Sequence, residues 1–397
     1  MTHRDSPVLD ERYNLSPLKG TNLFKPLTLS DHIQLNHRLV YSPLTRFRSN
    51  PKDYCPTDLQ VEHYDQRSKR PGSIIITEGT YISEKASGFP AGVPGIWSDD
   101  QIESWSKVFK KIRENGSYSI VQTFHMGRQA LPGVLSSHGL KYKAPSPIYA
   151  PILGADDDAE VEAKKYNNEL TALTLEEVEE TIQDFLTAGK NAIKAGADAI
   201  QVHVANGYLL NQFLDPSANQ RTDKWGGSIE KRSALPLRII DDLIKEIGAS
   251  KITVRIRPFG TAGNMAGNSH HLILAQYAHF IGELEKRALE GNRLLFLDIV
   301  EPLDTDDYDG GSNEFVYSIW KGFVVRAGDY IANEQRLREH VSNPKTLISI
   351  GRHYISNPDL PDRLENGWKL TKYDRSTFYT NGAEGYIDYP RYENIAK

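Results

Sequence analysis

The chain has 397 residues, of which 39% are hydrophobic and 25% charged, so its composition is typical of a soluble globular protein. No apolar run approaches the roughly 18 residues of a membrane span, and a net charge of -5 offers no basic face for nucleic acid. Cys55 is the only cysteine, which excludes an intrachain disulfide framework and a cysteine-cluster metal site. The first residues lack the apolar core of a secretory signal, so we expect a cytoplasmic protein.

Eight short runs rich in Ile, Val, Leu or Thr recur along the chain, and each is too short for a helix. Such runs are typical of parallel strands that are buried on both faces. They span residues 39–44, 73–78, 119–124, 199–204, 252–257, 295–300, 323–328 and 346–351.

Amphipathic helices are predicted between these runs. Ser98 with Gln101, and Thr174 with Glu177, have the spacing of a capping box at a helix start. Eight strands that alternate with helices predict an α/β fold, an eight-stranded parallel βα (TIM) barrel. An open doubly wound sheet also fits the alternation, but eight units favour closure. No linker divides the chain, so we expect a single domain over residues 1–397.

Three segments exceed what the barrel needs. Residues 131–173 predict a lid or hairpin at the barrel top, and the glycine-rich residues 260–271 predict a mobile loop. The residues after Gly351 are rich in aromatic side chains, so we expect this C-terminal extension to pack back on the barrel.

Polar residues gather at the predicted carboxyl ends of the strands, where βα barrels carry their chemistry. A hydrolase would need two carboxylates, and Glu78 and Glu301 are the natural candidates, although structural roles fit them better. A metal site is disfavoured, because the predicted ends supply single histidines, and adjacent His270 and His271 are expected to be solvated. No G-x-S-x-G elbow is present.

The last two strands end in glycines, at Gly328 and Gly351, and Arg352 follows the second. The loops after strands seven and eight form the common phosphate site of βα barrels. Ordinary strand-to-helix turns are the alternative interpretation of the glycines. Because no G-x-G-x-x-G or Walker loop occurs, a phosphate-bearing ligand across the barrel top is favoured over a separate nucleotide domain.

The segment QVHVANGYLLNQFLDPSANQRTDKWGGSIEKR, residues 201–232, resembles the Old Yellow Enzyme family of flavin-dependent ene-reductases. The motifs SPLTRFR, IITEGTYIS, VQTFHMGR, ITVRIRPFG, FVYSIWKG, RAGDY, SIGRHYISNPDL and YDRSTFY recur in the family's order, and the yeast members are nearest in character. The resemblance implies a barrel that binds FMN tightly, with NADPH as the hydride-donating cosubstrate. It assigns FMN contacts to Thr45, Gly79, Gln122, Arg255, Gly328, Gly351 and Arg352.

The resemblance also implies a substrate site. His203 and Asn206 match the family pair that binds the substrate carbonyl oxygen or a phenolate, and Tyr208 matches the proton donor to the α-carbon. Tyr379 and Phe124 match residues that line the pocket. Phe124 stands where relatives often carry tryptophan, and Arg257 stands where they often carry a small polar residue. The segment 303–313 is also shorter than in close yeast relatives.

The function implied is ping-pong reduction of the activated C=C bond of α,β-unsaturated carbonyl compounds. We expect enones and phenols as ligands, no nucleic-acid or membrane partner, and a monomer or homodimer. Two alternatives stay open: a low-turnover flavoprotein that binds phenols or steroids, and a flavin-free barrel hydrolase that uses Glu78 and Glu301.

Overall fold

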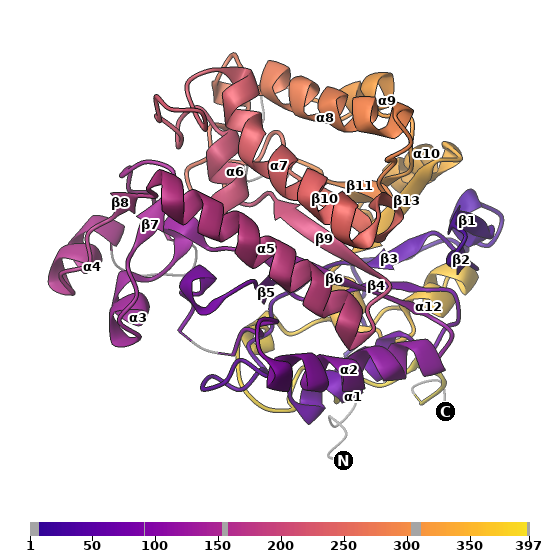
Figure 1. Ribbon diagram of the computed structural model, residues 1–397. Coiled ribbons are helices and arrows are strands. Elements are labelled where there is room, and N and C mark those ends of the chain that lie inside the picture. Colours follow the sequence, from indigo (N-terminus) through magenta and orange to yellow (C-terminus); the bar gives the residue numbers. More distant parts are fainter. Residues whose placement is uncertain (1–7, 91, 153–157, 303–310, 395–397) are drawn as a thin grey trace.

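Eight parallel strands close on themselves in the computed structural model, which describes residues 8–90, 92–152, 158–302 and 311–394 (Figure 1). Each strand pairs with the next along the chain, and the last pairs with the first, so the predicted barrel is confirmed and an open sheet is excluded. The strands are β3 (Leu39–Tyr41), β4 (Ile74–Ile76), β6 (Tyr118–Phe124), β9 (Ala199–Val204), β10 (Ile252–Ile256), β11 (Phe296–Val300), β12 (Val324–Ala327) and β13 (Thr346–Ile350).

Helices cover the outside of the barrel and bury their apolar faces against the strands (Figure 1). Both predicted capping boxes are present, at Ser98 and Gln101 and at Thr174 and Glu177. No helix within the described ranges is long and apolar enough to cross a membrane. The outer helices are α1 (Asp58–Arg67), α2 (Asp99–Glu114), α5 (Leu175–Ala195), α7 (Ile229–Ile247), α8 (Ile273–Leu289), α9 (Phe315–Ile319), α10 (Glu334–Ser342) and α12 (Leu360–Asn366).

An antiparallel hairpin packs against the amino end of the barrel. It consists of β1 (Leu27–Ser30) and β2 (Ile33–Leu35), and Ile33 and Leu35 are buried among apolar side chains of the barrel strands. The sequence analysis missed this hairpin because its two strands have only four and three residues. Since apolar residues fill this end of the barrel, the polar side chains inside it gather at the other end.

The insertion at residues 131–173 forms a small unit beside the barrel (Figure 1). It contains α3 (Pro132–Ser137), β7 (Lys143–Ala144), α4 (Ala159–Lys165) and β8 (Thr171–Ala172). The expected hairpin is wrong, because β7 and β8 run parallel and the chain between them returns through α4.

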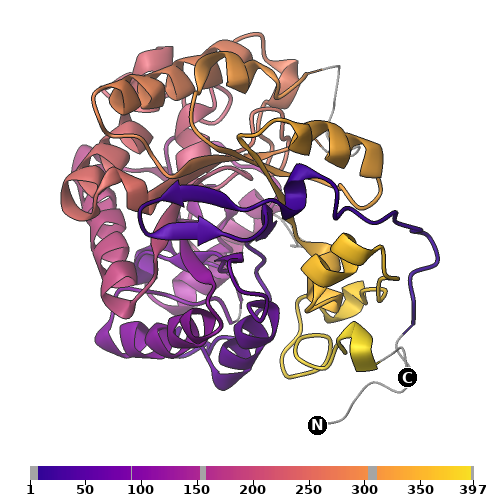
Figure 2. The same ribbon diagram turned by 90° about the vertical axis from the view of Figure 1, so that its right-hand side faces the viewer.

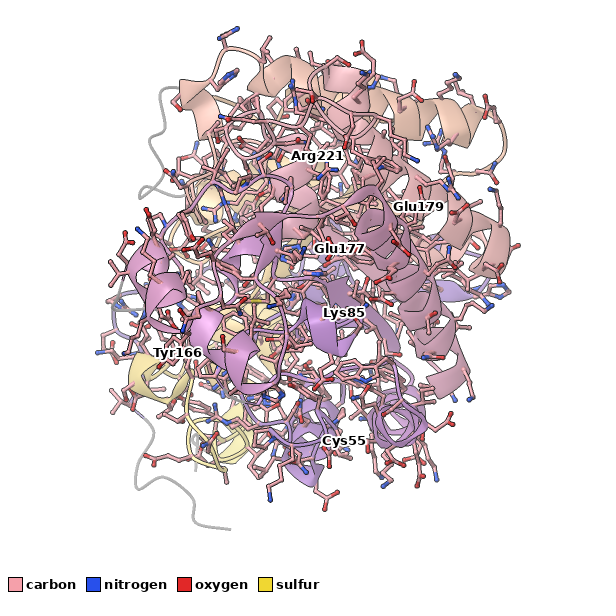
Figure 3. The ribbon with its side chains drawn as sticks, turned by 60° about the vertical axis from the view of Figure 1, so that its left-hand side comes forward. Cys55, Lys85, Tyr166, Glu177, Glu179 and Arg221 are labelled. Atoms are coloured by element: carbon pink, nitrogen blue, oxygen red, sulfur yellow. The ribbon has the colours of Figure 1, made fainter. Side chains whose placement is uncertain are left out.

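Several polar contacts tie this insertion to the barrel, among them an ion pair and hydrogen bonds from Arg221. Lys143 forms an ion pair with Glu177 of α5, and Arg221 donates to the carbonyl oxygen of Leu173 at 2.6 Å. Figure 3 shows Glu177 and Arg221 on this side of the molecule.

The C-terminal extension packs back on the barrel, as predicted, and lies beside the N-terminal segment (Figure 2). Buried Arg46, just after β3, donates to the carbonyl oxygens of Phe378 at 3.0 Å and Gly385 at 2.8 Å. The ring of Tyr386 stacks on His63 of α1 with the ring centroids 4.0 Å apart. Arg46 therefore serves as an anchor for the extension.

We expect Arg46→Met to lower the free energy of unfolding by about 3 kcal/mol, because two buried carbonyl oxygens lose a charged donor. Urea denaturation measures this change. Arg375→Met, which removes an exposed arginine of the same extension, serves as the control and should change stability by no more than about 0.5 kcal/mol. Equal losses in the two variants would contradict the anchoring role.

Candidate active site

A hollow that is open to solvent lies at the carboxyl ends of β3 and β10 to β13. It brings together four of the predicted site residues, Arg255, Gly328, Gly351 and Arg352. The remaining lining residues come from the same strand ends, the segments after them and, for Tyr373, the C-terminal extension: Ser42, Pro43, Leu44, Val300, Ala327, Asp329, Ile331, Ser349, Ile350, His353 and Tyr373.

The two glycines form a close-packed wall of this hollow. A Cβ atom at Gly328 would stand 3.0 Å from Cγ of Glu301, and one at Gly351 would stand 3.1 Å from Cδ2 of Leu44. Gly351 precedes the short helix α11 (Arg352–Ser356), and the Arg352 side chain is exposed at the rim. The exposed guanidinium of Arg352, together with backbone that a ligand can approach closely at the two glycines, suits an anionic group.

A chain of hydrogen bonds crosses the interior of the barrel beside the hollow. Nε2 of Gln122 donates to Oε1 of Gln201 at 2.8 Å, and Nε2 of Gln201 donates to Oδ2 of Asp298 at 2.9 Å. Nη1 of Arg255 donates to the same carboxylate oxygen at 2.5 Å. Nε of Arg255 is buried and has no hydrogen-bond partner among the described residues. The arginine thus keeps N–H donors for a ligand, the one on Nε among them.

Three rings pack together at the ends of β6 and β9. The ring of Tyr208 lies edge-on to Phe124, with centroids 5.0 Å apart, and 5.2 Å from the ring of His203. Nδ1 of His203 is buried and has no hydrogen-bond partner in the described part of the chain.

Burial keeps both polar rings uncharged. It lowers the pKa of His203 far below the ordinary value, and the neighbouring charge of Arg255 lowers this pKa further. Burial also raises the pKa of Tyr208, with a smaller contribution from Tyr379. At neutral pH the site therefore offers a neutral imidazole and a protonated phenol.

Asn206 lies on a tight turn directly after β9. Its φ of 60° and that of Gly207, 79°, both fall in the left-handed region, which asparagine and glycine tolerate best. Side chains are excluded at Gly207, where a Cβ would stand 2.6 Å from the carbonyl oxygen of Ala262. Nη1 of Arg257 approaches Oδ1 of Asn206 at 3.4 Å, so the amide lies beside the guanidinium.

The other predicted residues lie around the same end of the barrel. Gly79 packs against Phe124, because a Cβ there would stand 3.0 Å from the phenyl ring. Half-buried Thr45 follows Leu44, which lines the hollow. Tyr379 is 64% exposed, and its ring lies 5.5 Å from that of Phe47. Tyr379 therefore belongs to the rim and lies outside the ring cluster.

The two carboxylates considered for hydrolysis have structural partners. Glu78 is buried and accepts from Nε2 of Gln60 at 2.9 Å, and burial raises its pKa to about 7. Glu301 pairs with buried Arg326 and accepts from Nη2 of Arg336 at 3.1 Å.

The rings of His270 and His271 stack on each other, with centroids 4.7 Å apart. Within the described ranges, no three His, Cys, Asp or Glu residues are placed to hold a metal ion. The segment 303–313, which we expected to be shorter than in close yeast relatives, lies mostly outside the described residues.

The sequence analysis gave no role to Gln201 or to Asp298, although both lie in predicted strands. Gln201 is two residues before His203, and a period of two places both side chains on one face of β9. That signal locates Gln201 inside the barrel but cannot name its partners, which stand on other strands.

Comparisons with known proteins agree with this geometry. Residues 22–371 match the model of the NADH:flavin oxidoreductase / NADH oxidase family. Enoate reductase 1 of Kluyveromyces lactis is 44% identical, over 96% of this chain and 97% of that protein. A probable NADPH dehydrogenase of Candida albicans is 39% identical, over 98% of this chain and 95% of that protein.

A solved structure is similar over nearly the whole length. The crystal structure of Old Yellow Enzyme from Pichia sp. AKU4542 superposes with a TM-score of 0.88 at 40% identity, covering 95% of each chain. The two structures are similar over the whole closed barrel, including the strand ends that line the hollow. The chain thus belongs to the NADH:flavin oxidoreductase / NADH oxidase family and, within it, is a flavin oxidoreductase of the Old Yellow Enzyme type.

Proposed function

We propose that this chain is an FMN-dependent NADPH dehydrogenase that reduces the activated C=C bond of α,β-unsaturated carbonyl compounds. The observation that carries the proposal is the buried, unpartnered Nδ1 of His203, which lies in a cluster with the protonated phenol of Tyr208. His203 is a neutral hydrogen-bond donor that suits a carbonyl oxygen, and Tyr208 beside it is an acid that suits the α-carbon next to that carbonyl group. The names of the two curated relatives, an enoate reductase and a probable NADPH dehydrogenase, support the same activity.

The residues around the hollow fit FMN. Arg255 has a buried N–H without a protein partner, which suits the electron-rich pyrimidine edge of a flavin. Gln122 is connected to Arg255 by hydrogen bonds through Gln201 and Asp298. The phosphate could approach the backbone closely at Gly328 and Gly351, and the guanidinium of Arg352 offers it a positive charge. Gly79 and Thr45 complete the expected contacts. Bound FMN would accept a hydride from NADPH and deliver it to the β-carbon of the alkene.

The protein side chains would handle the charge and the proton of this reaction. As the β-carbon gains its hydride, the electron pair of the C=C bond moves toward the carbonyl oxygen. His203 and Asn206 would donate hydrogen bonds to that oxygen and stabilise its negative charge. Tyr208 would give its proton to the α-carbon, and solvent would reprotonate its phenolate. Phe124 and Tyr379 would line the pocket.

Both substrates would use one site in turn. The sequence has no dinucleotide-binding glycine motif, so NADPH and the alkene would alternately occupy the site at His203, Asn206 and Tyr208 beside the flavin, in a ping-pong sequence. We further propose that residues 1–397 act as one FMN-binding domain.

We expect Tyr208→Phe to slow reoxidation of the reduced flavin by cyclohexenone by about 10²–10⁴-fold, because the α-carbon loses a positioned acid. Reduction by NADPH needs no such acid and should change little. Stopped-flow measurement of each half-reaction separates the two effects. Tyr166→Phe, which alters an exposed tyrosine at the end of α4 in the insertion (Figure 3), is the control. Unchanged reoxidation by cyclohexenone would remove Tyr208 from the acid role. A wild-type protein that binds phenols but is not reoxidised by the enone would be the low-turnover alternative.

We expect His203 to stay neutral in the folded protein at pH values where the unfolded chain binds a proton. The pKa of His203 is lowered by folding, so wild-type stability falls as pH drops below about 6.5. Relative to His203→Gln, the wild type should lose about 1 kcal/mol between about pH 7.5 and 5.5. Urea denaturation of both proteins at both pH values measures this difference. A constant difference would mean that folding leaves the pKa of His203 unchanged, and the neutral-donor assignment would fail.

We expect Arg352→Ala to weaken FMN binding by about 1.5–3 kcal/mol, the usual range for a hydrogen bond to a charged group. Titration of the apoprotein by flavin fluorescence gives the dissociation constant. Arg375→Ala removes an exposed arginine of the C-terminal extension and should leave the affinity unchanged. Undiminished affinity in Arg352→Ala would remove the phosphate assignment.

A further inference from the structure

Asp298 is a buried carboxylate that the proposed reaction does not use. It is the third residue of β11, and its side chain has 0% exposure. Its Oδ2 accepts from Nη1 of Arg255 and from Nε2 of Gln201, whereas its Oδ1 has no hydrogen-bond partner among the described residues. Burying a carboxylate is costly, and this one lies against Arg255, which lines the hollow.

The contacts show which form of Asp298 the site holds. Both groups at Oδ2 are obligate donors in this arrangement, a guanidinium N–H and an amide N–H. A protonated carboxyl group would leave its own O–H on Oδ1 without an acceptor. The ionised form is therefore the one that the surrounding donors stabilise, and it forms an ion pair with Arg255.

The ionised carboxylate also sets the sense of the hydrogen bonds beyond it. Because a carboxylate only accepts, Gln201 must turn its amide nitrogen toward Asp298 and its Oε1 toward Gln122. Gln122 must then donate to Gln201, which leaves its own Oε1 and one N–H for a ligand. The amide of Gln122 on β6 is thus oriented by a carboxylate on β11, three strands away in the sheet.

We propose that Asp298 is a positioning residue that sets both the charge and the donor pattern under the flavin. It compensates the charge of Arg255, which lines the hollow, and through Gln201 it fixes the amide of Gln122. This inference rests on the proposed FMN site and deepens it. A compensated arginine stabilises the anionic reduced flavin less than an isolated one, so Asp298 holds the flavin potential down and keeps the reduced flavin a stronger hydride donor.

The decisive variant is Asp298→Asn, which keeps the size of the side chain and its acceptor but removes the charge. We expect the ratio of the FMN dissociation constants, oxidised over reduced, to rise about tenfold. For a two-electron couple this equals an upward shift of about 30 mV in the midpoint potential. A reductive titration against a reference dye measures the potential, and fluorescence titration of the apoprotein measures binding of oxidised FMN.

Asp198→Asn is the matched control. Asp198 precedes β9 at the opposite end of the barrel, where it accepts from the backbone N–H of Ser119. This variant loses the same charge far from the hollow and should leave the potential unchanged. An unchanged or lowered potential in a folded Asp298→Asn protein that binds FMN would overturn the proposal, as would equal shifts in both variants.

Gln201→Met tests the second part of the proposal, including the case in which Asp298→Asn does not fold. It keeps the ion pair of Asp298 with Arg255 but breaks the connection to Gln122. We expect several-fold weaker binding of oxidised FMN with an unchanged potential, and undiminished binding would contradict the proposal. Neither the potential nor the FMN affinity depends on alkene turnover. A protein that fails to reduce alkenes would therefore contradict only the proposed function. A wild-type apoprotein that binds no FMN would instead contradict the proposed FMN site and, with it, the proposed function.

Discussion

The register of the parallel strands decides which side chains meet inside this barrel. Arg255 of β10 stands level with His203 of β9 and with Asp298 of β11, and Gln122 of β6 stands level with Gln201 of β9. Side chains alternate between the two faces of a strand, so a shift of one residue in β10 would turn Arg255 outward into the helix layer. The hollow, the hydrogen-bond chain and the ring cluster all depend on this one alignment.

Much of the fold could be predicted from local sequence, because buried parallel strands and capped helices each carry a short-range signal. All eight strands lie within their predicted runs or overlap them closely, and both capping boxes are present. The hairpin of β1 and β2 was not predicted, because strands this short show no detectable alternation of apolar and polar residues. The parallel sense of β7 and β8 depends on how α4 returns the chain, which the local pattern does not contain.

The site was predictable only in part, and the reason is sequence distance. Strand ends located Arg255, Gly328, Gly351 and Arg352 near one another, and the family resemblance assigned them tasks. The contact of Gln201 with Asp298 joins residues 97 positions apart, and that of Arg46 with Gly385 joins residues 339 positions apart. Neither pairing follows from composition or periodicity, because it is created by the closure of the barrel and the return of the C-terminal extension.

The two sides of the site treat charge differently, and this difference fits the proposed chemistry. Around His203 and Tyr208, burial removes charge altogether, so a carbonyl oxygen that becomes negative would meet neutral donors in a place of low dielectric, where hydrogen bonds are strong. Around Arg255, charge is present but paired with Asp298 inside the barrel. A lone buried cation there would favour the reduced, anionic flavin and make it a poorer hydride donor. By pairing the arginine, the barrel keeps a directional donor for the flavin while limiting the field that would trap it in its reduced form.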